Sequence, residues 1–175
     1  SNLLMEVLDG LPDTKNVKIL FSAHGLPQKV VNRGDPYQWQ VEQSAQAIAA
    51  FAKIPSDSWN ICYQSRVGPM KWIGPSLDIA LKRAAEIRAA VVVLPIAFVS
   101  EHSETLVELD IEYKNLANDL GIHVYHRVPA LGTHQIFIEG LRDLTIMAFQ
   151  QKISIGPAGK IKGCTADFPQ CPCHV

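Results

Sequence analysis

A histidine follows an apolar run near the start of the chain. Residues 17–21 read VKILF, and the sequence continues to His24 before a loop rich in glycine and proline. An imidazole titrates near physiological pH, so it can accept a proton or bind a metal ion. The same histidine can also be a structural residue beside a well-capped turn. The residue type alone leaves both interpretations open.

Three glutamates are spaced four residues apart, at Glu104, Glu108 and Glu112. On an α-helix this spacing makes one acidic stripe, in which like charges cost about 0.2–0.5 kcal/mol per pair. One interpretation is a solvated surface face, and the spacing alone favours it. The other is a path for protons or hydrated cations, because carboxylate oxygens bind hard cations. The stripe begins beside His102, which supports the second interpretation.

Two large apolar residues, Met70 and Trp72, stand in the polar and glycine-containing segment YQSRVGPMKWIGP, residues 63–75. A polarizable thioether and a broad indole suit a pocket for a flat aromatic ligand. They can equally be packing residues beneath a loop.

The segments that must position these residues alternate between strand-like and helical patterns. Short apolar runs rich in β-branched and aromatic residues predict strands at 17–23, 59–65, 89–98 and 122–128. Apolar residues at helical spacing predict helices at 41–52, 77–84, 106–120 and 137–148, with Pro75, Gly121 and Thr133 as boundary signals. This order predicts an α/β fold of the Rossmann-like type: a four-stranded parallel sheet with helices on both faces.

Open parallel sheets bind ligands beyond the carboxyl ends of their strands. His24 lies at the end of the first predicted strand, Ser65 and Arg66 at the end of the second, and residues 100–102 after the third. We therefore expect these polar residues to gather at one edge of the sheet.

Composition and motifs exclude several classes of function. The chain has 175 residues with 16 basic and 17 acidic side chains, so no basic footprint points to nucleic acid. Its longest apolar run, residues 89–99, is shorter than the roughly 20 residues that span a bilayer. No signal peptide, P-loop, dinucleotide fingerprint or zinc-protease helix is visible. We expect a cytoplasmic protein in a reducing compartment.

Four sequence blocks together resemble the ferrochelatase family: LFSAHGLP, NRGDPY, QSRVGPMKWIGP and PIAFVSEHSETLVELDIEY. They span residues 20–113, and a weaker likeness continues to about residue 150. The resemblance implies a chelatase-type lobe that takes part in inserting ferrous iron into protoporphyrin IX to form protohaem. It also implies two similar lobes with the porphyrin between them. Residues 1–155 would be the C-terminal lobe, and the N-terminal lobe of the same enzyme its partner.

The resemblance also assigns roles to individual residues. His24 matches the family's active-site histidine and Glu104 its partner carboxylate, and both are implied metal contacts together with Glu108 and Glu112. The implied porphyrin pocket comprises Tyr37, Met70, Trp72, Phe98, Glu101 and His102. Whether the histidine removes pyrrole protons or delivers the metal stays open for the family, and our interpretation is that His24 accepts protons. Peripheral contact with a membrane is also left open.

A cysteine-containing tail, residues 156–175, follows the predicted lobe. Cys164, Cys171 and Cys173 have the spacing C-x6-C-x-C. Some ferrochelatases hold a two-iron–two-sulfur cluster with C-terminal cysteines, so the resemblance raises a cluster here as a cofactor. Such clusters take four ligands, and a tail with reduced thiols is the alternative.

Two other functions remain compatible with the sequence. One is a related chelatase for another tetrapyrrole or another metal. The motifs NRGDPY and VGPMKW favour protoporphyrin over this alternative. The other is a porphyrin- or haem-binding module without chelatase activity, against which both His24 and Glu104 are present.

Overall fold

The computed structural model describes residues 2–12, 16–151 and 168. A single four-stranded sheet runs through this part of the chain, in the order β2-β1-β3-β4. Every pairing is parallel, as the sequence predicted. The strands are β1 (Val17–His24), β2 (Trp59–Gln64), β3 (Ala90–Pro95) and β4 (Tyr125–Arg127).

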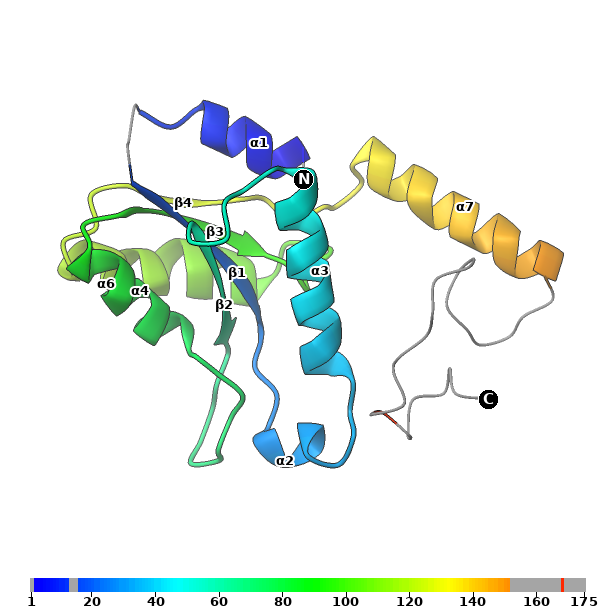
Figure 1. Cartoon of the computed structure of the whole chain (residues 1–175), viewed down its shortest axis with the longest axis horizontal. Helices are drawn as coiled ribbons and strands as arrows, with labels where there is room; N and C mark the ends of the chain where they lie inside the picture. Colours follow the sequence, from blue (N-terminus) through cyan, green and yellow to red (C-terminus); the bar gives the residue numbers. More distant parts are fainter. Residues whose placement is uncertain (1, 13–15, 152–167, 169–175) are drawn as a thin grey trace.

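Helices cover both faces of this sheet (Figure 1). Leu77 and Leu81 of one helix pack with Leu109 and Ala117 against the face that carries Val91. The opposite face packs mainly against the first and third helices. The helical elements are α1 (Asn2–Asp9), α2 (Gln28–Val31), α3 (Tyr37–Phe51), α4 (Leu77–Glu86), α5 (Ser103–Leu106), the π-helix η1 (Glu108–Glu112), α6 (Tyr113–Asp119) and α7 (Gln135–Gln151).

Alternating side chains of the central strands divide the core into two layers. Ile19 and Phe21 of β1 face α1 and α3, whereas Leu20 faces α4 and α6. These residues are almost fully buried, so both faces of the sheet are apolar. Such double burial explains why the strands read as continuous apolar runs.

The predicted third helix, 106–120, is not one regular helix. It is divided among the end of α5, the π-helix η1 and α6. The amide of Glu112 donates to the carbonyl of Val107, five residues earlier, which widens the turn. The apolar spacing persists through this change, and so the sequence pattern did not reveal it.

Other boundaries also differ from the predicted ones. β3 ends at Pro95, which has no amide hydrogen for the ladder, and the edge strand β4 has only three residues. Ser76 is the N-cap of α4, because its hydroxyl accepts from the amide of Ile79, so Pro75 precedes the helix and is not in its first turn. The carbonyl of His134 accepts the first bond of α7, so Thr133 is not its N-cap.

The predicted boundary between lobe and tail lies outside the described residues, as do Cys164, Cys171 and Cys173. The domain division and the iron–sulfur cluster therefore stay predictions. Among the described helices, none combines the length and the apolar character needed to cross a membrane.

Candidate active site

His24 is the last residue of β1, and two contacts hold it in place. The Tyr37 hydroxyl donates to the His24 carbonyl at 3.0 Å, which fixes the end of the strand. The ring atom Nδ1 lies 2.6 Å from the carbonyl oxygen of Gly25. A carbonyl can only accept, so Nδ1 carries the hydrogen and the neutral ring has its lone pair on Nε2.

Glu104 faces this open nitrogen from α5. His24 Nε2 and Glu104 Oε1 are 3.5 Å apart, and their side chains are 43% and 36% exposed. A proton accepted at Nε2 would therefore turn the pair into an ion pair, in which the carboxylate stabilises the charged ring. The structure thus brings together the two residues that the sequence singled out at different strand ends.

Burial, and secondly the negative charge of Glu104, raise the pKa of Tyr37. Its hydroxyl consequently remains a hydrogen-bond donor at neutral pH. The role of Tyr37 in this structure is to support the backbone of His24.

Glu108 is tied to the end of β2. Its carboxylate accepts from the Ser65 amide at 2.7 Å, from the Ser65 hydroxyl and from Gln64 Nε2. Gln64 also donates to the Glu104 carbonyl at 2.7 Å and accepts from Ser22. Ser22 and Gln64 are fully buried, so the sheet core itself holds the acidic segment in position.

A pocket of about 710 Å³ opens at the carboxyl edge of the sheet. Glu104 is among its lining residues, whereas His24 and Tyr37 are not. Glu104, Glu108 and Glu112 all line it, although they lie on two elements instead of one regular helix. Met70 and Trp72 also line it, and their predicted role in binding a flat aromatic ligand stays a prediction. The other lining residues are Ser65, Arg66, Val67, Gly68, Asp78, Ser103, Val107 and Tyr113.

Close packing at Gly25 joins the end of β1 to residues 65–72, the pocket loop that follows β2. A Cβ at this position would lie 2.9 Å from Arg66 Cγ and 3.2 Å from Trp72 Cε3. It would also lie 3.0 Å from the carbonyl oxygen of Gln64, which accepts the Gly25 amide. Only glycine allows this approach of the loop.

Phe98, Glu101 and His102 do not line the large pocket. Phe98 is buried, and its ring packs against that of His102 at 5.2 Å. His102 caps α5, because its Nδ1 accepts from the Glu104 amide at 3.2 Å. These residues shape the segment that presents Glu104, and their assignment to the porphyrin pocket stays a prediction.

Glu101 belongs to an ion cluster centred on Arg127. The guanidinium binds Glu101 at 2.9 Å and Asp110 of η1 at 2.6 Å. Burial acts to raise the pKa of Glu101, but hydrogen bonds involving Thr105, Ala130 and Arg127 outweigh it and lower that pKa. Arg127 thereby connects β4 to both ends of the segment that carries Glu104 and Glu108.

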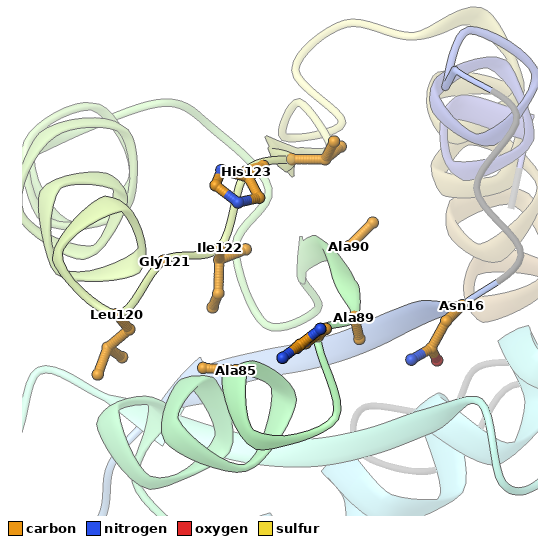
Figure 2. Close-up of a pocket in the computed structure, with 10 residues that line it drawn as sticks. Asn16, Ala85, Ala89, Ala90, Leu120, Gly121, Ile122 and His123 are labelled. Atoms are coloured by element: carbon orange, nitrogen blue, oxygen red, sulfur yellow. The ribbon is translucent and has the colours of Figure 1, made fainter.

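A second cavity, of about 530 Å³, lies at the opposite, amino edge of the sheet (Figure 2). Its wall consists mostly of alanines at the end of α4 and at the start of β3, and of Leu120, Gly121 and Ile122. Asn16 at its margin donates to the Ile87 carbonyl. None of the candidate site residues that the sequence analysis named lines this cavity, so the pocket at the carboxyl edge is the candidate site.

The described residues contain no group of three or more His, Cys, Asp or Glu side chains placed to hold a metal ion. The carboxylate of Glu108 already accepts three hydrogen bonds.

Comparison with protein-family models identifies the family of this chain. The family model described as Ferrochelatase matches residues 1–148. The chain belongs to the ferrochelatase family. It is 49% identical to the ferrochelatase of Pelagibacter ubique over 168 residues and 52% identical to that of Caulobacter vibrioides (strain NA1000) over 165. A ferrochelatase of Rickettsia felis is 41% identical over 166 residues.

The chain spans about half the length of these ferrochelatases. The alignments cover 96%, 91% and 93% of this chain but 49%, 46% and 48% of the respective relatives. The fold also resembles a crystal structure of a CbiX protein assigned to cobalamin (vitamin B12) biosynthesis, from Marinobacter aquaeolei VT8. The TM-score is 0.55 at 16% identity, covering 77% of this chain and 98% of that one, which confirms the α/β fold.

Several pocket and support residues escaped the sequence analysis. Gln64 and Ser22 form the buried connection to the glutamates, and Asp78 and Tyr113 complete the pocket wall. Polar residues within an apolar strand were the one signal available for Gln64 and Ser22. Nothing in the spacing of Asp78 and Tyr113 indicated that they face the same pocket.

Proposed function

We propose that the whole protein inserts ferrous iron into protoporphyrin IX and that this chain supplies the base and the acidic path for the metal. Family membership supports a chelatase, and the 3.5 Å approach of His24 Nε2 to Glu104 is the observation that carries the assignment of roles. Residues 1–155 would then be the C-terminal lobe of the enzyme. The remaining half would complete the porphyrin site.

The first chemical task is to remove two pyrrole protons from the macrocycle. His24 is the proposed acceptor, because its hydrogen-bonded Nδ1 leaves the Nε2 lone pair open. Glu104 beside it stabilises the imidazolium that forms. The 43% exposure of the His24 side chain leaves the ring accessible to a substrate.

The second task is to exchange the water shell of the iron for pyrrole nitrogens. Glu112 and Glu104 offer carboxylate oxygens along one wall of the pocket. Glu108, between them in sequence, is held by Ser65 and Gln64, so we assign it chiefly to anchoring this wall. Iron would approach along the glutamates and reach the porphyrin near His24.

The porphyrin itself requires a broad apolar surface. Met70 and Trp72, which line the same pocket as the glutamates, would provide it. Tyr37, Phe98, Glu101 and His102 would border the bound ring, and the N-terminal lobe would cover its other side.

The test is iron insertion by the intact gene product, followed through the change in porphyrin absorbance, with the 175-residue chain assayed beside it. We expect turnover by the intact protein with protoporphyrin IX and ferrous iron. Sirohydrochlorin and cobalt serve as the competing substrates. Preference for either would replace the proposed specificity, and porphyrin binding with no insertion of any metal would indicate a binding module.

A further inference from the structure

The helix α7 is rich in apolar side chains, and almost nothing among the described residues packs on it. No residue of α7 whose burial is described is fully buried, and Ile136 and Phe149 are 58% and 84% exposed. Figure 1 shows α7 lying away from the sheet and its covering helices. The exposed apolar residues of this helix are Ile136, Ile138, Leu141, Leu144, Ile146 and Phe149.

These residues occupy a broad part of the helix surface. At about 100° per residue, the positions from Ile136 through Leu144 and Leu141 to Phe149 cover an arc of about 220°. The polar residues Glu139, Arg142, Asp143 and Gln150 lie together on the remaining arc, which also contains Ile146. Thr145 and Gln151 are polar residues within the apolar arc. An ordinary surface helix has an apolar stripe of roughly 100°. The arc on α7 is therefore too wide to be left in water, yet one polar stripe remains to face solvent.

The extent of this arc constrains what can cover it. A pair of identical helices packed around a two-fold axis buries one narrow stripe on each. An arc of about 220° instead requires a groove that encloses the helix on more than one side, as in helix-in-groove recognition. The occupant of the surface must therefore be a larger body.

The family comparison points to one such body. The matched region continues to residue 148, so most of α7 belongs to the common ferrochelatase domain. The related ferrochelatases are about twice as long as the aligned region, which covers 46–50% of them. The half of these ferrochelatases that lies outside the aligned region can therefore supply the surface that covers this helix.

We propose that α7 is a docking helix that lies in an apolar groove on the half of the protein outside these 175 residues. Its apolar arc faces that groove and its polar stripe faces solvent. The helix thus joins the two halves through residues that do not line the pocket at the carboxyl edge. This inference rests on family membership and the surface of α7, and not on the proposed chemistry.

Hydrogen–deuterium exchange of the intact gene product and of the 175-residue chain tests this directly. We expect the amides of α7 to exchange slowly in the intact protein and rapidly in the 175-residue chain. The amides of α4, which packs on the sheet, should be slow in both and serve as the internal reference. Porphyrin and iron are absent from this experiment, so its failure would leave the proposed function standing.

A pair of substitutions sharpens the test in the intact protein. Leu144→Glu places a charge within the apolar arc and should speed exchange of α7 about tenfold or more. Gln150→Glu adds the same charge on the polar stripe and should leave exchange unchanged.

Three outcomes would overturn the proposal. Rapid exchange of α7 in the intact protein would show that no groove holds it. Slow exchange already in the 175-residue chain would mean that a second copy or the chain itself covers it, which light scattering separates. Equal effects of Leu144→Glu and Gln150→Glu would show that the apolar arc is not the contact surface.

Discussion

At the scale of single residues, the site depends on which nitrogen of His24 is open and what faces it. The contact of Nδ1 with the Gly25 carbonyl leaves Nε2 as the nitrogen with the lone pair, 3.5 Å from Glu104 Oε1. The two residues come from different elements, and their meeting was predictable because parallel strands end at one edge. The supporting hydrogen bonds from Tyr37 and Gln64 were not predictable, since they depend on side-chain directions in the folded chain.

The glutamates should differ in importance for turnover. Glu104→Gln removes the charge that faces His24, and we expect iron insertion by the intact protein to fall about 100-fold. Glu112→Gln changes a carboxylate farther along the pocket wall and should have a far smaller effect. Steady-state kinetics of both variants decide this, and equal losses would favour the interpretation of the stripe as a solvated face.

Cys62 should be almost unreactive in the folded protein. The thiol is fully buried, and burial raises its pKa to about 12, although a hydrogen bond with Ser22 acts in the opposite direction. The thiolate is the reactive form, so little is available at pH 8. Alkylation followed by peptide mass spectrometry should show slow labelling of Cys62 in native protein and rapid labelling in urea. Rapid labelling of the native protein would contradict this burial.

At the scale of elements, the acidic segment is held by the ends of two strands. β2 holds Glu108 through Ser65 and Gln64, and β4 holds Asp110 and Glu101 through Arg127. The sequence predicted this segment as one regular helix, because apolar spacing does not distinguish an α-helix from one that contains a π-turn. The hydrogen bonds to the strands are tertiary contacts, which a periodic pattern does not encode.

Removing Arg127 should loosen this segment. The arginine side chain is 10% exposed, so Arg127→Met leaves Asp110 and Glu101 without their cation and should lower the free energy of unfolding by about 1–3 kcal/mol. Urea unfolding at pH 7 measures the loss. An unchanged midpoint would show that the cluster contributes nothing to stability.

The same cluster predicts a pH dependence. The pKa of Glu101 is below its ordinary value of 4.5 in the folded protein, so its contribution is present above that value. The contribution is lost as pH falls from about 4.5 through the lower folded pKa. Arg127→Met should therefore show a weaker acid destabilisation than the parent protein over this window. If the free energy of unfolding fell equally with decreasing pH in the two proteins, the ionisation of Glu101 would not be linked to the Arg127 cluster.

A separate prediction concerns the contact between the pocket loop and the end of β1. Gly25→Ala places a Cβ within 3.0 Å of the Gln64 carbonyl and should cost about 1–3 kcal/mol of stability. At Gly10 a Cβ would make ordinary contacts at 3.5 and 3.6 Å, so Gly10→Ala is the control. Thermal unfolding of both variants should lower the midpoint of the first alone. Tolerance of alanine at position 25 would show that the loop can move away from β1.

At the scale of the whole molecule, the order of strands and helices was enough to predict a parallel sheet with helices on both faces. Composition alone did not reveal that β4 would be a short edge strand or that α7 would stand apart. Both features depend on what lies next to an element: β4 has β3 on one side only, and α7 lacks a covering layer within the described residues. The resemblance of four sequence blocks identified the family, and the comparison with known ferrochelatases confirmed it.

The central claim is that His24 accepts the pyrrole protons, and one variant tests it most directly. In the intact protein, His24→Ala should reduce iron insertion about 100-fold or more. The Kd for protoporphyrin should change little, because the apolar surface at Met70 and Trp72 supplies much of the binding. Insertion rate and porphyrin Kd measured on the same preparation give the answer. Retained turnover in His24→Ala would contradict the account.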